Sequence, residues 1–193
     1  MEETITVPKS SCLEETTIGS MNYDVLSVLL ARGHLLQLNR GAEIGVLYGD
    51  TSYHLLQSFP SLTLYSIDPY VAYEEVEGQR TAQILSNYER LARTRLGQFG
   101  DRSKMIKDFS VNAATQFPDG YLDFVFIDAL HTYEAVKADM KAWWRVVRTD
   151  GFFCGHDYRW PGVGDAVNEF AAEKGLKGFH TPPTSDIWFF VKP

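Results

Sequence analysis

The stretch Gly41-Ala-Glu-Ile-Gly-Val-Leu-Tyr-Gly-Asp-Thr-Ser52 decides the fold that we expect for this chain. Its first half is apolar except for one acid, Glu43, and predicts a buried strand from Ala42 to Leu47. Gly49 and the three polar residues after it predict a tight turn and the start of a helix that ends at Pro60. A strand that runs through a glycine turn into a helix presents backbone N–H groups to a ligand at the helix start.

An acid follows the next predicted strand. Residues 62–67 are mostly apolar and lead into Asp68, about twenty residues after the glycine turn, where a βαβ unit places a carboxylate against a ribose diol. The loop differs from the dinucleotide-binding fingerprint because Glu43 and Leu47 stand where two of its small residues would be. We therefore infer a ligand with one nucleoside and no pyrophosphate. The alternative is a glycine turn that serves only to make the bend.

The composition is that of one globular domain. The chain has 193 residues, of which 45% are hydrophobic and 22% charged, which suffices for one core and not for two ordinary domains. We expect residues 1–20 to form a flexible arm and residues 21–193 to form a single domain. No apolar run approaches the roughly 20 residues of a membrane span, and the polar N-terminus does not read as a secretory signal.

Charge and cysteine content indicate the partners and the compartment. The formal net charge of −7 disfavours nucleic acid as a partner and favours a small-molecule substrate. The two cysteines, Cys12 and Cys154, lie outside any metal-ligand spacing, so we expect a reduced, cytoplasmic setting. Two-fold homo-oligomers are the commonest assemblies, so we expect a homodimer.

Strands and helices alternate along the rest of the chain. Helices are expected at residues 21–38, 79–97, 133–147 and from 161 onwards, and strands at residues 102–107, 122–127, 152–155, 178–181 and 187–191. The last two strands follow each other closely. The pattern therefore predicts an α/β fold with a doubly wound, Rossmann-like, mostly parallel seven-stranded sheet, an antiparallel edge strand and helices on both faces. Residues 69–78 are expected to form a solvated loop, or alternatively a substrate lid.

Candidate site residues follow three of these strands at their C-terminal ends. They are Asp108 and Phe109 after residues 102–107, Asp128 and His131 after residues 122–127, and His156 and Asp157 after residues 152–155. Neighbouring parallel strands end at the same edge of a sheet, so we expect the carboxylates of Asp128 and Asp157 to converge. The alternatives are a helix cap for Asp108 or Asp128 and a hydrogen bond to the backbone for His131.

Two motifs resemble those of a known family. The pattern Glu43-x-Gly-x-x-x-Gly-x-x-Ser52 resembles the cofactor loop of class I S-adenosylmethionine (SAM) methyltransferases. The segment from Phe126 through Asp128-Ala-Leu-His-Thr-Tyr to Asp139, with the later Gly-His-Asp-Tyr158, resembles small class I methyltransferases. Members of this group include metal-dependent O-methyltransferases of antibiotic sugars. The resemblance covers residues 43–170, and it leaves out the N-terminal arm and the loop after the second strand.

The resemblance implies a function and the residues that carry it. It implies SAM-dependent O-methylation of a small hydroxylated molecule, either a sugar or a secondary metabolite. The implied cofactor-binding residues are Glu43, Gly45, Gly49 and Ser52 at the methionine end, Asp68 at the ribose, Asp108 and Phe109 at the adenine, and also Asp128. His131 matches a position near the transferred methyl group or the methionine carboxylate. Asp128 and His131 are the candidate catalytic residues, since an acceptor hydroxyl must lose its proton.

A divalent metal is also implied. Asp128 and Asp157 correspond to the metal-binding acids of the family, and His156 stands where some members have another acid. Hard oxygen donors suit magnesium or manganese. Because neighbouring strand residues point to opposite faces, His156 and Asp157 reach one ion only if the strand has already turned.

Two other functions are alternatives. A SAM-binding protein without transferase activity, acting as a sensor or as the partner of another subunit, would not need to turn Asp128, His131 and Asp157 toward the cofactor. A nicotinamide-dependent oxidoreductase is disfavoured by the small residues missing from the glycine loop.

Overall fold

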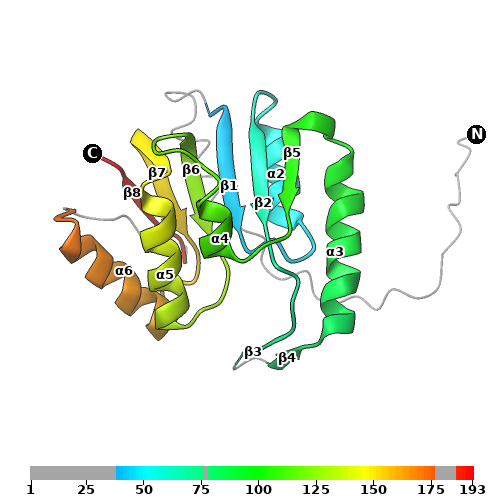
Figure 1. Cartoon of the computed structure of the whole chain (residues 1–193). Coiled ribbons are helices and arrows are strands. Elements are labelled where there is room, and N and C mark those ends of the chain that lie inside the picture. Colours follow the sequence, from blue (N-terminus) through cyan, green and yellow to red (C-terminus); the bar gives the residue numbers. More distant parts are fainter. Residues whose placement is uncertain (1–37, 76–77, 177–185) are drawn as a thin grey trace, which may run out of the picture.

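A computed structural model of the chain describes residues 38–75, 78–176 and 186–193. A six-stranded sheet in the order β5-β2-β1-β6-β7-β8 forms the centre of the described part (Figure 1). Its strands are β1 (Arg40–Ile44), β2 (Thr63–Ile67), β5 (Ser103–Ile106), β6 (Leu122–Ile127), β7 (Val147–Gly155) and β8 (Trp188–Val191). All neighbours pair in parallel except β8, which pairs antiparallel with β7.

The doubly wound, mostly parallel sheet with an antiparallel strand at its edge is therefore confirmed. The strand expected at residues 178–181 lies outside the described residues, so a seventh strand stays a prediction. The expected arm and the helix at residues 21–38 also lie outside them, and the division into arm and domain stays a prediction.

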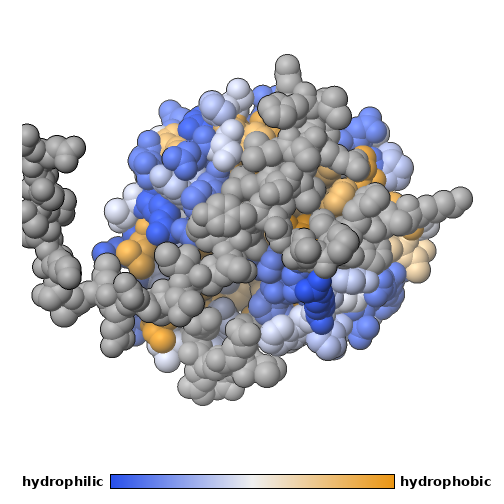
Figure 2. Space-filling model, turned by 180° about the vertical axis from the view of Figure 1, so that it is seen from behind, coloured by the Kyte–Doolittle hydropathy of each residue, from blue (hydrophilic) through white to orange (hydrophobic). Residues whose placement is uncertain are grey.

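Helices cover both faces of the sheet (Figure 1). They are α2 (Asp50–Ser58) and α3 (Ala82–Gly97) on one face, and α4 (Ser110–Ala114), α5 (Tyr133–Trp144) and α6 (Pro161–Glu173) on the other, with a short 3-10 turn, η1 (Gly100–Arg102), before β5. No helix among the described residues combines the length and the apolar character that crossing a bilayer requires. From the side opposite to Figure 1, the coloured residues form a mixed surface, with hydrophobic residues in small separate groups (Figure 2).

The central strand β6 shows why the sequence forms this sheet. All six of its residues are buried. Val125 and Ile127 pack with the α5 and α6 side, whereas Phe124 and Phe126 pack with the α2 and α3 side. Successive side chains of a strand point to opposite faces, so a strand covered on both sides needs an unbroken apolar run. On β1, a Cβ at Gly41 would come within 2.1 Å of the Phe124 ring, so the glycine leaves room for that ring.

The segment after β2 contains two strands that were not predicted from its sequence. Strands β3 (Tyr73–Glu75) and β4 (Gly78–Arg80) form an antiparallel hairpin that projects from the sheet (Figure 1). Helix α3 begins three residues later than expected, at Ala82, because the side chain of Thr81 accepts a hydrogen bond from the amide of Ile84 at 3.3 Å and caps the helix.

Strand β7 begins earlier than the expected residue 152, at Val147, and runs through Asp150 and Gly151. Asp150 has a positive φ of 58°, which makes an irregularity inside the strand. The backbone remains paired there, because the amide of Asp150 donates to Lys192 O at 2.8 Å and the amide of Lys192 donates to Gly151 O at 2.9 Å. Pairing with the C-terminal segment thus continues a strand that local sequence would end.

Candidate active site

A cavity of about 830 Å³ lies at the C-terminal ends of the parallel strands. Backbone hydrogen bonds join neighbouring strand tips across the sheet, from Asp68 N to Ile106 O, Gly45 N to Ile67 O, Asp128 N to Ile44 O, and His156 N to Ile127 O. Ligands of open α/β sheets bind at this edge. The tips therefore form one continuous floor for the cavity.

Most of the expected site residues line this cavity. They are Glu43, Gly45, Asp68, Phe109, Asp128, His131, His156 and Asp157. Gly49, Ser52 and Asp108 are described but do not line it. Their contacts nevertheless place them directly behind lining residues.

The glycine loop turns where β1 ends. Gly45 and Gly49 have positive φ angles of 88° and 81°, and Leu47 adopts 51°. A Cβ at Gly45 would come within 2.0 Å of Asp128 O, so only glycine fits against the tip of β6. Gly49 is the N-terminal cap residue of α2 and donates its amide to Val46 O at 2.8 Å. The loop is thereby closed before the helix begins.

Asp68 holds this loop from the end of the neighbouring strand β2. Its Oδ2 accepts hydrogen bonds from the amides of Val46 and Leu47, both at 3.0 Å, and its Oδ1 accepts from Tyr70 N at 2.8 Å. An ionised carboxylate has about four acceptor positions, so one remains for a ligand in the cavity. Sequence reasoning assigned Asp68 to the ligand and missed its contacts with the loop.

Glu43 lies at the floor of the cavity with an exposed fraction of only 2%. The hydroxyl of Ser52 donates to Glu43 Oε2, and it lies 2.7 Å from the hydroxyl of Ser66. Burial raises the pKa of the Glu43 carboxyl well above its usual value, and the hydrogen bond from Ser52 opposes that rise. Ser52 therefore supports Glu43 from beneath.

Phe109 lines the β5 end of the cavity and is 57% exposed. Asp108 Oδ1 accepts a hydrogen bond from the amide of Phe109 at 2.8 Å and a long one from Asn112 Nδ2 at 3.4 Å. Asp108 thus holds the start of α4, a helix that sequence reasoning missed because it spans only five residues.

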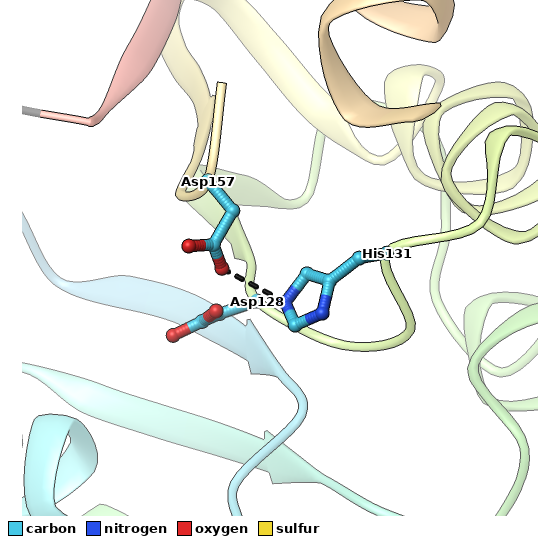
Figure 3. Close-up of side chains that lie close together, drawn as sticks. All are labelled: Asp128, His131 and Asp157. Atoms are coloured by element: carbon cyan, nitrogen blue, oxygen red, sulfur yellow. Dashed lines mark ion pairs between the residues drawn. The ribbon is translucent and has the colours of Figure 1, made fainter. Parts of the chain in front are cut away.

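Asp128, His131 and Asp157 come together between the tips of β6 and β7 (Figure 3). One possible ligand atom from each lies within 4.8 Å of the others. His131 Nε2 is 2.8 Å from Asp157 Oδ2, the ion pair drawn in Figure 3. Two carboxylates and one imidazole at this spacing can move a proton or share a metal ion. The expected convergence of Asp128 and Asp157 is present in the structure.

Asp157 can turn into this cluster because the chain has already left β7. Its φ is 56°, in the left-handed region, and its carbonyl accepts from Trp160 N at 2.9 Å. His156 Nδ1 lies 3.1 Å from Asp157 Oδ1, so Asp157 contacts two imidazoles at once. Among the described residues, His156 is not part of the group whose ligand atoms converge.

The two imidazoles change the protonation of this cluster. Burial alone would raise the pKa of the Asp157 carboxyl, but hydrogen bonds from His131 and His156 lower it below its usual value. Burial alone would lower the pKa of His156, but its hydrogen bond to Asp157 and the charge of Asp128 raise it. Asp157 is therefore an ionised acceptor that can orient His131.

One pair of residues on α5 bears on the alternative that the protein is a nicotinamide-dependent oxidoreductase. Tyr133 and Lys137 have the Tyr-x-x-x-Lys spacing found in nicotinamide-dependent oxidoreductases. Lys137 Nζ lies 2.8 Å from the hydroxyl of Tyr133, and both side chains bind Glu169 on α6. Neither residue lines the cavity. In this structure the pair joins two helices and does not face a ligand site.

The chain is similar to known proteins both in family and in fold. A family model described as a methyltransferase domain matches residues 42–158, more than half of the chain. No curated protein matches. The solved O-methyltransferase NovP superposes with a TM-score of 0.68 at 14% identity, covering 88% of this chain and 78% of NovP.

Two further solved structures share the fold. A candidate caffeoyl-CoA O-methyltransferase from Staphylococcus aureus gives a TM-score of 0.65 at 14% identity, covering 88% of this chain and 83% of its own. CalS11, a TDP-rhamnose 3'-O-methyltransferase of calicheamicin biosynthesis, gives 0.58 at 15% identity, covering 88% and 79%. The chain belongs to the methyltransferase domain family, among the class I SAM-dependent methyltransferases.

Proposed function

We propose that this methyltransferase transfers the methyl group of SAM to a hydroxyl group of a small molecule, a sugar or a secondary metabolite. The observation that carries the proposal is the order of side chains along the strand tips. Phe109 follows β5, Asp68 follows β2, Asp128 follows β6 and Asp157 follows β7. Neighbouring strands lie about 4.8 Å apart, so a nucleoside with a methionine tail fits along this edge with an acceptor beside it.

The cavity fits SAM in size and in chemistry. Its volume of about 830 Å³ lies within the range of small-molecule sites. Asp68 has one remaining acceptor position for a ribose hydroxyl, and Glu43 provides a buried carboxyl for the methionine amino group. The absent Cβ of Gly45 lets the loop lie against the backbone at the tip of β6. Phe109 is proposed for the adenine face, with Asp108 acting behind it.

The acceptor is proposed to lie at the β6 and β7 end. SAM supplies a methyl group on a sulfonium sulfur, and its in-line displacement depends on positioning. Asp157 accepts the hydrogen bond of His131 Nε2 and so holds the imidazole with its proton on that nitrogen. His131 or Asp128 then takes the proton from the acceptor hydroxyl. Gly49 and Ser52 are proposed to support the methionine end through the loop and Glu43.

We also propose a magnesium or manganese ion held by Asp128 and Asp157, with His131 as the third donor when its Nε2 no longer donates a proton to Asp157. Such an ion lowers the pKa of a bound hydroxyl. Two carboxylates and one imidazole favour manganese over magnesium, because nitrogen donors suit the softer ion. His156 was also expected as a ligand, and its contact with Asp157 gives it a supporting role behind that ligand.

Calorimetry on the whole chain tests the cofactor. S-adenosylhomocysteine, the demethylated product, should bind at one site, whereas NAD should give no binding heat. Binding of NAD alone would overturn the proposal. Turnover is tested by the release of S-adenosylhomocysteine from SAM over a panel of sugars and phenols. If S-adenosylhomocysteine binds but no acceptor is methylated, and Asp128→Asn binds it equally well, the inactive SAM-binding alternative is favoured.

Assembly and location complete the proposal. A homodimer is proposed because two-fold assemblies are the commonest. A cytoplasmic location is proposed because the chain has few cysteines. No nucleic-acid partner is proposed, because the formal net charge is −7. Light scattering on the purified chain distinguishes a dimer from a monomer.

A further inference from the structure

Asp139 is a buried acid that lines the same cavity and takes no part in the methyl transfer proposed above. It lies on α5 and is only 6% exposed. Burial of an ionisable group is costly unless it has partners. A carboxyl group held at a cavity wall therefore calls for an explanation beyond packing.

The contacts around Ser110 bear on what Asp139 can do. Trp143 Nε1 donates to Ser110 Oγ at 2.9 Å, and the Ser110 hydroxyl lowers the pKa of the Asp139 carboxyl. An indole N–H only donates, so the Ser110 oxygen accepts that bond and the Ser110 proton stays available to an acceptor such as Asp139. A carboxylate has about four acceptor positions, so Asp139 keeps acceptor capacity on a side chain that lines the cavity.

The neighbours of Asp139 place it at one end of the cavity. Phe109, Ser110 and Val111 from the start of α4 line that end, together with Ala138 on α5. Strand β5, which precedes α4, is the neighbour of β2, whose tip carries the acid proposed for the ribose. The cluster proposed for methyl transfer lies in the other direction, at β6 and β7. The base of a nucleoside whose ribose binds at β2 thus extends toward Asp139.

We propose that Asp139 accepts a hydrogen bond from the exocyclic amine of the adenine base and so selects adenine over hypoxanthine. This inference rests on the proposed function, because it assumes that SAM occupies the cavity. Ser110 and Trp143 act as positioning residues that hold the carboxyl in place. Burial raises the pKa of Asp139 to about 6, against the lowering effect of the Ser110 bond, and an amine donor would offset part of that cost.

The alternative role for Asp139 is purely structural, as the end of a link between α4 and α5. The two roles differ in what they do to ligand selectivity. A structural link would affect every ligand at this end of the cavity equally. A hydrogen bond to the amine would affect only ligands that carry the amine.

Calorimetry on the whole chain with S-adenosylhomocysteine and S-inosylhomocysteine tests the proposal, since the second ligand has a carbonyl in place of the amine. The natural chain should prefer the adenosine compound by about 10- to 100-fold. In Asp139→Ala this preference should fall to near unity. In Asp139→Asn it should fall or reverse, because an amide can donate to the inosine carbonyl.

Two matched variants complete the design. Ser110→Ala removes one positioning contact but keeps the carboxyl group itself, so the ligand preference should fall only in part and stay above that of Asp139→Ala. Glu134→Gln removes an exposed acid from the same helix and should change nothing. Thermal melting of each variant checks folding. An equal loss of both ligands in Asp139→Asn, or an unchanged preference, would overturn the proposal. If the natural chain binds neither ligand, the proposed function itself fails.

Discussion

The carboxylate of Asp68 accepts hydrogen bonds from the backbone amides of Val46, Leu47 and Tyr70 and also lines the cavity. A side chain with these contacts links ligand binding to the shape of the glycine loop. Removing its charge should therefore weaken both. The two effects can be measured separately.

Asp68→Asn should lower the affinity for S-adenosylhomocysteine by roughly 10- to 150-fold, because a charged hydrogen bond to the ribose is lost. It should also lower the free energy of unfolding by about 1–3 kcal/mol, since an amide NH2 cannot accept from a backbone N–H. Calorimetry and urea unfolding measure these effects, with the exposed Asp101→Asn as control. Unchanged affinity would remove Asp68 from the ribose site.

The raised pKa of Asp139 predicts how stability depends on pH. Its usual value of 3.8 applies in the unfolded chain and about 6 in the folded one. A raised pKa gives stability that is present below pH 3.8 and is lost as the pH rises through 6. The shift corresponds to roughly 3 kcal/mol. Asp139→Asn cannot ionise, so its stability relative to the natural chain should rise by up to that amount over this interval.

Urea unfolding of both proteins between pH 4 and pH 7 checks this prediction, with the difference between the two curves as the readout. The difference cancels the titration of all other groups. Asp101→Asn serves again as the control and should run parallel to the natural chain. Parallel curves for Asp139→Asn as well would show that this carboxyl is not neutral in the folded protein at pH 5.

At the scale of elements, the glycine loop depends on close contact between two strand tips. Gly45→Ala would place a Cβ within 2.0 Å of Asp128 O at a φ of 88°. Gly100→Ala faces open space at a φ of 56° and so isolates the cost of the backbone conformation. Gly45→Ala should therefore lower the free energy of unfolding by a further 1–3 kcal/mol or so. Equal losses in urea unfolding would mean that the contact relaxes freely.

The loops after β6 and β7 together form the proposed metal site. Manganese should bind to the chain after chelator treatment. Loss of a residue that only supports a metal ligand lowers metal affinity by roughly 10- to 100-fold. Asp128→Asn or Asp157→Asn removes a ligand itself and should lower the manganese affinity by more than that. His156→Ala removes such a supporting residue and should show that smaller effect. Calorimetry with manganese measures all three, and Asp165→Asn on the exposed side of α6 is the control. Affinity that is identical in Asp128→Asn would exclude this site.

At the scale of the whole molecule, the cavity joins the two faces of the sheet. On one face it is lined by Tyr48, just before α2, and by Asp50, the first residue of α2. On the other face it is lined by Ala135 and Ala138 in α5. Each face has its own apolar cluster. A ligand that contacts both sides should stabilise the described domain as one unit.

S-adenosylhomocysteine at one hundred times its dissociation constant should add about 2.7 kcal/mol to the free energy of unfolding. For a chain of 193 residues this corresponds to a rise in Tm of roughly 5–10 °C. Calorimetric melting should show one transition that shifts as a whole. NAD at the same concentration provides the control. A shift confined to part of the unfolding heat would mean that the two faces unfold separately.

Local sequence was enough to predict the sheet strands of the described part, the long helices and the acids at the strand tips. The six apolar residues of β6 and the helical spacing of Val136, Met140 and Trp143 in α5 are properties of short segments. Such segments reveal which faces must be buried, because periodicity is a local consequence of backbone geometry. The convergence of Asp128 and Asp157 followed from the rule that parallel strands end at one edge.

Contacts between distant segments decided the rest. Asp68 holds amides that lie 21 and 22 residues earlier, and Ser110 meets Trp143 from 33 residues away. Strand β7 continues through Asp150-Gly151 because Lys192, from the end of the chain, pairs with it. The side chain of Asp139 is buried at the cavity wall only because α4 packs against α5. Hydrogen bonds and burial of this kind depend on which segments become neighbours in the folded chain, and only the tertiary structure sets that.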